Sequence, residues 1–344
     1  MKATRACYIA LPLESVLARN KIFTLALTLA STLTFGLTVS TGTSAQTQPW
    51  PNRQIRFIVP FAPGGANDLM ARTAALGASK ILGQPIVVEN KPGAGGTIGA
   101  DAAAKSAGDG YTFLISAAGV ISNSMIKRNM PYQDSDLVPV AMIGLAPSVI
   151  LVAPNSPYKT IKDLVEASRA AGGLHFATAG TGSTPHFVAE LLNTRYGAKL
   201  DPVPYKSGSE STTALIGGQI AATSEASIVS LGYLKSGKLR GLATTWVKRI
   251  EAYPDLPTAA EQGFPEIRIA HWAGLHAPKG TPLEILDKMS ASIDAAMRSA
   301  SVIERMTPLG IQPMGGTRAD FERFVADERA RLGATVRAAG MKED

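Results

Sequence analysis

Cysteine is almost absent from this sequence of 344 residues, in which Cys7 is the single example. Cys7 lies in an N-terminal segment that we predict is removed, so the mature chain would contain none. A chain without cysteine has no disulfide framework, no Cys-ligated zinc site and no thiol nucleophile. The fold must then be held by its hydrophobic core alone, and the remaining residues suffice for a large core or two domains.

Clusters of positive charge are also missing. The chain has 34 basic and 27 acidic residues. Loss of the N-terminal segment removes Lys2, Arg5, Arg19 and Lys21 against the single acid Glu14, which leaves an excess of about four positive charges. Because these charges are scattered, the sequence excludes the basic face of a nucleic-acid-binding protein. It remains compatible with a small anionic ligand.

Several motifs of enzymes and metal sites are absent or incomplete. Residues 232–238 nearly match a phosphate-binding loop, but Leu239 stands where Ser or Thr must contact magnesium. HExxH does not occur, and His271 and His276 are too few ligands for a metal site. Trp272 between them is either a flat apolar wall for a ligand or a core side chain. We therefore expect no metal and no cofactor.

The N-terminus has the three parts of an export signal. Basic residues precede an uncharged run over residues 22–39, and the small residues Thr43-Ser44-Ala45 follow. This order is typical of a cleavable secretory signal. A membrane anchor is the alternative, but Thr, Ser and Gly lower the hydrophobicity of the run and no basic stop-transfer cluster follows. We predict a signal peptide over residues 1–45, cleavage near Ala45 and a periplasmic location, with no lipid anchor.

Short apolar runs alternate with helical patterns along the mature chain. This alternation predicts an α/β fold with mainly parallel sheets. Capping boxes at Thr160-x-x-Asp163, Thr281-Pro282-x-Glu284 and Thr317-x-x-Asp320 predict three helix starts. The predicted strands cover residues 55–59, 86–88, 111–115, 149–152, 176–177, 239–243 and 267–269.

A first glycine loop, residues 60–68, lies between a predicted strand and a predicted helix. Gly64 and Gly65 leave the backbone N–H groups unobstructed, and the helix N-terminus adds partial positive charge, which suits a carboxylate. Asp68 could accept a hydrogen bond from a ligand or a bridging water. The alternative is that Asn67 or Asp68 only caps the helix.

Two further glycine loops follow strands. The loop at residues 90–99 departs from the dinucleotide pattern and is expected to form a tight turn. The loop at residues 177–186 could bind a second anionic group through backbone N–H groups and hydroxyls. Its Ser183 and His186 also raise the alternative of a serine esterase, but the G-x-S-x-G motif and a matching acid are missing.

Motifs along the whole mature chain resemble the Bug family, the extracytoplasmic solute-binding proteins of tripartite tricarboxylate transporters. They occur in order from the first glycine loop to the region after Trp272. The matching segments are residues 51–61 with 63–65 and Asp68, 87–96, 109–111, 131–136, 203–206, 217–219, 253–258, 272–274 and 277–282.

The resemblance implies a two-lobed, Venus-flytrap periplasmic-binding fold with a ligand between the lobes. Lobe 1 would comprise residues 46–147 and 270–344, and lobe 2 residues 148–269. The implied ligand-binding residues are Phe61, Gly64, Gly65 and Asp68 from lobe 1 and Ala179, Gly180, Gly182, Ser183 and His186 from lobe 2.

One region departs from the family pattern. After Gly217-Gly218-Gln219 the chain reads Ile-Ala-Ala-Thr-Ser before Glu225, where the family commonly has an acidic run and a Phe-Asp pair. The resemblance implies that Glu225 replaces an Asp that faces the cleft. A longer acid changes the cavity size and the available hydrogen bonds, so the ligand of a relative does not transfer.

The resemblance implies a non-enzymatic, monomeric protein that binds a small carboxylate and delivers it to the membrane subunits of a tripartite transporter. Presentation of the ligand to a signalling receptor is the alternative within the same class. A secreted esterase is the alternative from a different class. Nucleic acid is not an expected partner.

Overall fold

Ten strands form one mixed sheet in the computed structural model, which describes residues 49–343. The predicted signal peptide, residues 1–45, lies outside the described residues. The strands are β1 (Ile55–Val59), β2 (Ile86–Asn90), β3 (Thr112–Ser116), β4 (Leu137–Val152), β5 (Leu174–Thr178), β6 (Leu200–Pro204), β7 (Ala222–Ala226), β8 (Arg240–Thr244), β9 (Ala270–Pro278) and β10 (Gln312–Pro313).

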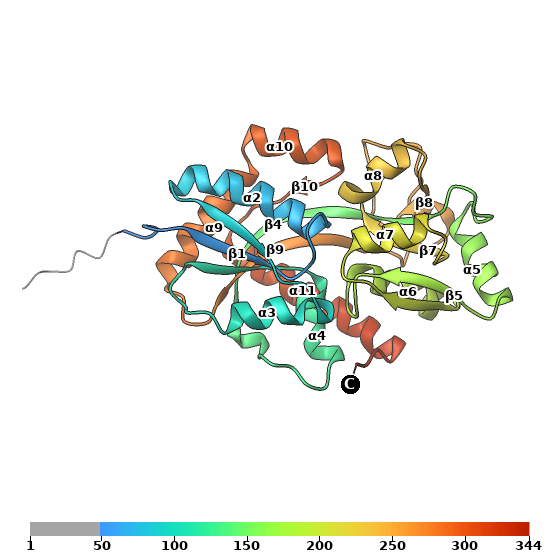
Figure 1. Cartoon of the computed structure of the whole chain (residues 1–344), viewed down its shortest axis with the longest axis horizontal. Coiled ribbons are helices and arrows are strands. Elements are labelled where there is room, and N and C mark those ends of the chain that lie inside the picture. Colours follow the sequence, from blue (N-terminus) through green and yellow to red (C-terminus); the bar gives the residue numbers. More distant parts are fainter. Residues whose placement is uncertain (1–48, 344) are drawn as a thin grey trace, which may run out of the picture. The chain divides into compact units, whose positions relative to one another are not determined.

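Helices flank both faces of this sheet (Figure 1). The α-helices are α2 (Ala66–Leu82), α3 (Thr97–Ala104), α4 (Ala118–Ile126), α5 (Ile161–Ala170), α6 (Thr184–Tyr196), α7 (Gly208–Ile216), α8 (Ser227–Lys235), α9 (Leu283–Met297), α10 (Ala300–Met306) and α11 (Arg318–Ala339). Short 3-10 helices are η1 (Ala94–Gly96), η2 (Asp134–Asp136), η3 (Ala260–Gln262) and η4 (Thr307–Leu309).

The long strand β4 links two groups of strands. Its residues from Leu137 to Pro147 pair with β9, which continues to β3, β1 and β2. From Ser148 to Val152 it pairs instead with β7 and β8, and β7 continues to β5 and β6. We call the β2-β1-β3-β9 group with its helices the first half and the β7-β5-β6 group with its helices the second half.

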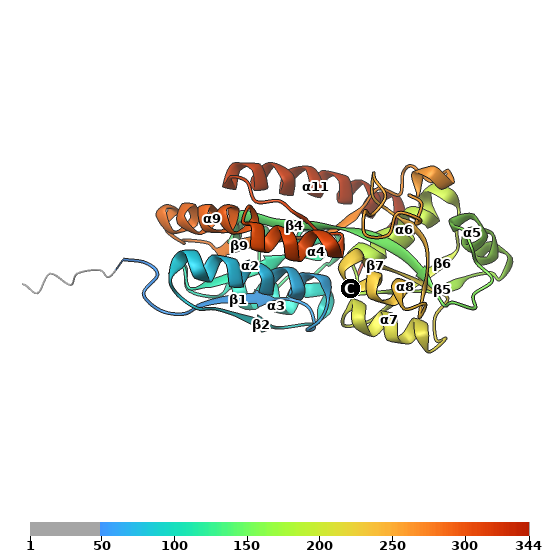
Figure 2. The same cartoon turned by 90° about the horizontal axis from the view of Figure 1, so that it is seen from above.

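Two large buried apolar clusters lie mainly in the first and in the second half, and the second cluster also includes Ala118, Leu145 and Trp272 of the first half. In the first half, α2 and α9 pack on each other and on β4, around Phe57, Phe113 and Met289. In the second half, Phe176 and Phe187 lie at the centre of a cluster that extends to α11. Helix α11 packs against β4, α4 and α6 and thereby touches both halves (Figure 2).

The sheet confirms most predicted strands and the α/β class. Parallel pairing holds for β1 with β2 and β3 and for β5 with β6 and β7, while β4 and β9 add antiparallel pairs. The strand predicted at residues 267–269 is wrong. Those residues precede β9; Ile267 and Ile269 are buried, Arg268 is exposed, and the Ile269 N–H donates to the carbonyl of Thr245.

Two of the three predicted capping boxes are confirmed. Thr160 caps α5 and Thr317 caps α11, each with a reciprocal bond from the Asp three residues on. The box at Thr281 is wrong, because Pro282 takes the N-cap position and Thr281 Oγ1 donates to the carbonyl of Pro278 at 2.7 Å. Within residues 49–343, no helix is both long and apolar enough to cross a membrane.

Candidate functional site

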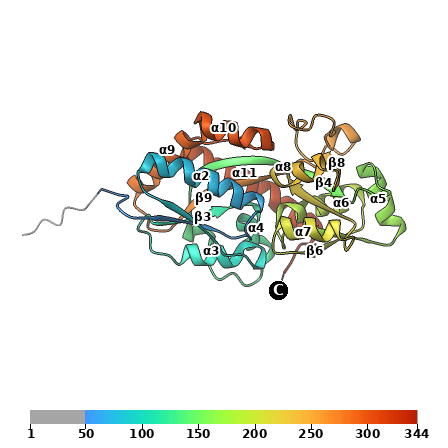
Figure 3. The ribbon, with the colours of Figure 1, turned by 45° about the horizontal axis from the view of Figure 1, so that its top comes forward.

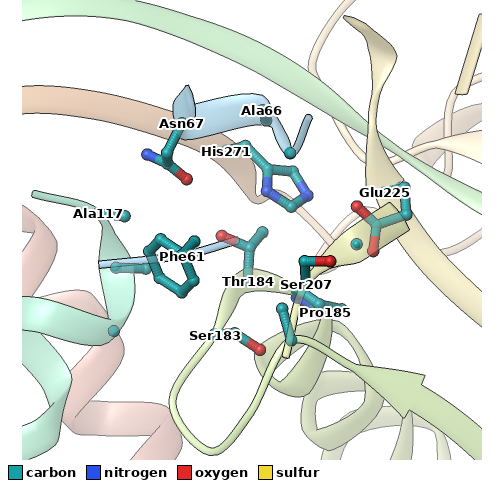
Figure 4. A pocket seen from close by; sticks show the side chains of 15 residues that line it. Phe61, Ala66, Asn67, Ala117, Ser183, Thr184, Pro185, Ser207, Glu225 and His271 are labelled. Atoms are coloured by element: carbon teal, nitrogen blue, oxygen red, sulfur yellow. The ribbon is translucent and has the colours of Figure 1, made fainter. Parts of the chain in front are cut away.

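The N-termini of four helices meet at one cavity in the interior of the molecule. Helices α2 and α4 come from the first half, and α6 and α7 from the second (Figures 3 and 4). Phe61 and Glu225 stand at different sides of it, with Thr184 and His271 between them (Figure 4). The cavity has a volume of about 40 Å³.

The helix ends supply positive potential because most of them have no side-chain cap. Gly65, Ala117 and Ser183 occupy the N-cap positions of α2, α4 and α6 and make no side-chain cap bond. The first N–H groups of a helix have no partner inside it and carry partial positive charge. No Lys or Arg is among the residues that line the cavity. Attraction for an anion therefore comes from backbone dipoles.

The first glycine loop is held from behind by Asp68. The Asp68 carboxylate accepts from the backbone N–H of Gly64 at 3.0 Å, from Asn90 Nδ2 at 2.9 Å and from Arg72 Nε at 3.0 Å. Asn90 Nδ2 also donates to the carbonyl of Phe61. Phe61 and Gly65 line the cavity, whereas Gly64 and Asp68 do not. Asp68 thus positions the loop.

Burial and hydrogen bonding act in opposite directions on Asp68. Its side chain is 3% exposed, and burial alone would raise the pKa of the carboxyl. The hydrogen bonds from Arg72, Gly64 and Asn90, together with the charge of Arg72, outweigh burial and lower the pKa below 3.8. Asp68 is therefore ionised at neutral pH, and its charge is matched by Arg72.

The third loop also splits into lining and supporting residues. Ala179 and Ser183 line the cavity, and Ser183 Oγ donates to the carbonyl of Gly180 at 2.6 Å. His186 Nδ1 accepts from the backbone N–H of Gly182 at 3.0 Å. Gly180, Gly182 and His186 shape the loop without lining the cavity. Ser183 and His186 each bond to the loop backbone, and no hydrogen bond between them is present in the described structure.

Glu225 lies at the end of β7 and lines the cavity, as the resemblance implied. Burial raises the pKa of its carboxyl to about 8, although the backbone N–H of Ala226 acts in the opposite direction. His271 of β9 also lines the cavity. Its Nε2 lies 3.2 Å from Ser148 Oγ, and burial lowers its pKa to about 3. Both side chains are therefore uncharged at neutral pH.

The second glycine loop touches the third. A Cβ atom on Gly95, which has φ +61°, would lie 2.5 Å from the carbonyl oxygen of Thr181 and would force the loops apart. Ser122 Oγ of α4 donates to the carbonyl of Gly182 at 3.1 Å. The predicted tight turn at residues 90–99 therefore also provides a close backbone contact between the two halves.

Comparison with known proteins shows the family to which the chain belongs. The model described as "Tripartite tricarboxylate transporter family receptor" matches residues 70–341. Protein BugT of Bordetella pertussis is 39% identical over 297 residues, which are 85% of this chain and 91% of that protein. The chain belongs to the tripartite tricarboxylate transporter receptor family, and its resemblance to Bug proteins is confirmed.

Solved structures of receptor-family relatives agree with the fold. The periplasmic binding protein BugD is 30% identical with a TM-score of 0.81 and covers 86% of this chain and 100% of its own. An R. palustris protein solved with adipate is 34% identical with a TM-score of 0.81, covering 85% and 99%. MatC from Rhodopseudomonas palustris, solved with bound malate, is 29% identical with a TM-score of 0.79, covering 83% and 100%. The two-lobed periplasmic-binding fold class is thus confirmed.

Sequence reasoning missed part of this receptor's cavity. The N-termini of α4 and α7, at Ala117 and Ser207, follow strands that lack a glycine-rich signature. The sequence did not indicate that His271 lines the cavity. Of the two alternatives for Trp272, a ligand wall and a core side chain, the structure shows the core side chain, because its ring packs edge-on to Phe324 and its Nε1 donates to Glu328 Oε1. Within residues 49–343 no group of three metal-ligating side chains is present.

Proposed function

We propose that the protein captures a small carboxylate in the cavity between its two halves and passes it to a tripartite tricarboxylate transporter. The observation that carries this proposal is the convergence of four helix N-termini on one cavity, three of them without a side-chain cap. Such N–H groups bind a carboxylate without a metal or a basic side chain. The adipate and malate of the two R. palustris relatives favour the same ligand class.

Ligand entry requires the two halves to separate. The cavity is lined by helix N-termini of both halves, so a ligand that is held between them can enter only when the halves move apart. We propose that residues 46–147 with 270–344 and residues 148–269 move as two lobes about the crossings in β4 and near Ala270. A ligand that touches both lobes stabilises the closed form, because only there does it make all its contacts.

The remaining parts of the proposal concern cellular context. Export directed by residues 1–45, with cleavage near Ala45, would place the protein in the periplasm, where its family relatives act. There it would act as a monomer and dock on the membrane subunits of its transporter. The cavity offers backbone donors and hydroxyls that can hold a carboxylate, so the proposed mechanism needs no cofactor.

A thermal-shift screen tests the proposed function. A ligand that binds only the native state raises the melting temperature in proportion to the logarithm of its concentration. Mono-, di- and tricarboxylates are compared with neutral sugars and amines of similar size. We expect at least one carboxylate to raise the melting temperature. A shift with sugars or amines and none with any carboxylate would refute the proposal.

A further inference from the structure

A buried carboxyl oxygen of Glu225 has no hydrogen-bond partner. Glu225 is 3% exposed, and its Oε1 is buried without a partner among the described residues. The side chain lines the cavity opposite Phe61 (Figure 4). A buried polar atom left unpaired is costly, so such an atom in a binding cavity indicates a partner that arrives with the ligand.

The surroundings of Glu225 hold no positive charge. The carboxyl lies directly against Gly208 at the start of α7, where a Cβ atom would collide with Oε2. Ser224 of the same strand hydrogen-bonds to Ser148 of the neighbouring strand β4, and Ser148 also contacts His271. His271 is the other titratable residue in the lining, and it is neutral.

Charged groups on the nearby elements are engaged elsewhere. Glu210 of α7 accepts from the backbone N–H of Lys206, and both residues line a different cavity. Asp68 of α2 is paired with Arg72. Among the described residues that line the cavity there is no Lys or Arg, so no side-chain cation in the lining neutralises an ionised Glu225.

We infer that Glu225 acts in binding as a neutral carboxylic acid that donates a hydrogen bond to a second polar group of the ligand. This inference rests on the proposed function, in which the helix N-termini hold the first carboxylate. The ligand class is then a molecule with a carboxylate at one end and a hydrogen-bond acceptor, either a second carboxylate or a carbonyl, at the other. A ligand with an ammonium group at that end is rejected.

The protonation state of Glu225 is consistent with this geometry. Its pKa of about 8 keeps the carboxyl protonated at neutral pH, and a buried neutral acid is an effective hydrogen-bond donor to an anion. Because its pKa is raised, the Glu225 carboxyl keeps the proton that it donates below about pH 8 and loses it as the pH rises through that value. Affinity should therefore fall in the alkaline range, where the ligand's own carboxylates stay ionised.

Matched ligands test the chemistry of the second group. Calorimetric titrations compare succinate, glutarate and adipate with β-alanine, 4-aminobutyrate and 5-aminopentanoate, which replace one carboxylate by an ammonium group. We expect the best diacid to bind at least about tenfold more tightly than its amino-acid counterpart. Tighter binding of the amino acid would overturn the inference, because an ionised Glu225 would then pair with the ammonium group.

The pH profile and one isosteric variant test the role of Glu225 itself. For the wild-type protein the dissociation constant of the diacid should rise about tenfold between pH 6 and pH 9. In Glu225→Gln, whose amide is always neutral and still donates, the constant should change little over this range and stay within about threefold of wild type at pH 6. The control Glu284→Gln alters an exposed residue of α9 and should retain the wild-type profile.

The outcomes separate this inference from the proposed function. A protein that binds none of these ligands or any other carboxylate refutes the proposed function and the inference with it. A protein that binds diacids, but loses more than about tenfold in affinity in Glu225→Gln at pH 6, refutes the inference alone. A Glu225→Gln variant whose dissociation constant still rises with pH as in the wild-type protein also refutes the inference alone.

Discussion

Asp68 organises the cavity without lining it. Its carboxylate joins the Gly64 turn, Arg72 of α2 and Asn90 at the end of β2. Asn90 in turn holds the carbonyl of Phe61, so one buried charge fixes both ends of the first loop. The sequence identified the residue and the loop, but not whether the carboxylate faces the ligand or the loop, because this depends on Asn90, 22 residues away.

Asp68→Asn is expected to destabilise the protein by about 1–3 kcal/mol, since hydrogen bonds to a buried charge are lost and Arg72 loses its partner. Urea unfolding at pH 7 measures this difference. Asp287→Asn is the control, because Asp287 is an exposed carboxylate paired with Arg318. Equal losses in the two variants would contradict the role given to Asp68.

The contribution of Asp68 to stability should depend on pH in a defined direction. Its folded pKa lies below the usual 3.8, so its stabilising contribution is present above the unfolded value and is lost as pH falls through the folded value. The difference in free energy of unfolding between wild type and Asp68→Asn should therefore shrink as pH falls below 3.8. A difference that stays constant down to pH 2 would contradict the assignment.

At the scale of whole elements, the second and third glycine loops meet backbone to backbone. Gly95 lies against the carbonyl of Thr181 and close to Gly180, a contact that joins the two halves beside the cavity. A side chain at Gly95 would hold the two halves apart. A side chain at a glycine far from this contact would leave the distance between the halves unchanged.

Gly95→Ala is expected to weaken ligand binding by at least about tenfold because it obstructs closure. Gly172→Ala is the matched control: Gly172 also has positive φ, +75°, but no atom would lie within 4 Å of its Cβ. Both variants should lose about 1–2 kcal/mol of stability from the left-handed backbone. Calorimetric titration and thermal unfolding measure the two effects. Equal affinities in the two variants would rule out the contact as a closing element.

Helix α5 begins at a cap that the sequence identified, and its energetic role can be measured. Thr160 Oγ1 accepts from the N–H of Asp163 at 3.1 Å, so Thr160→Ala should cost about 1 kcal/mol. In the control Thr213→Ala, the exposed interior position of α7 should be neutral or slightly stabilised, because Ala has the higher helix propensity. Urea denaturation compares them, and equal effects would contradict the capping role.

Short strands of apolar residues could be predicted from the sequence, whereas the polar strand β7 and the full length of β4 could not. β7 is fully buried although its sequence is Ala-Thr-Ser-Glu-Ala, because β4 and β5 cover it on both edges. β4 contains Pro139 and Pro147, which normally break a strand, and one register shift begins at Pro139. These strands depend on long-range pairing, which a local pattern of hydrophobicity does not report.

The candidate site was predictable where a loop carries glycine and, for Glu225, where the family resemblance points to an acid. Of the predicted residues, Phe61, Gly65, Ala179, Ser183 and Glu225 line the cavity. The helix starts at Ala118 and Gly208 join them through the fold, since the carboxyl ends of different strands converge on this point. Spacing along the sequence gives no sign of that convergence.

At the scale of the whole molecule, β4 and α11 are two of the elements that join the halves around the cavity. β4 runs from one group of strands into the other, and α11 packs on α4 and α6. Both halves contribute helix N-termini to the cavity. One bound carboxylate can therefore contact both halves and stabilise the arrangement in which they enclose it. The proposed capture mechanism depends on this.

Calorimetric titration of the protein with a dicarboxylate and with its diamide tests the central claim most directly. The two ligands match in length and in carbonyl geometry and differ in charge. The account predicts saturable binding of one dicarboxylate per protein chain, and at least about a hundredfold weaker binding of the diamide, because the helix N-termini favour an anion. Equal affinity for the diamide, or no binding of any carboxylate, would contradict it.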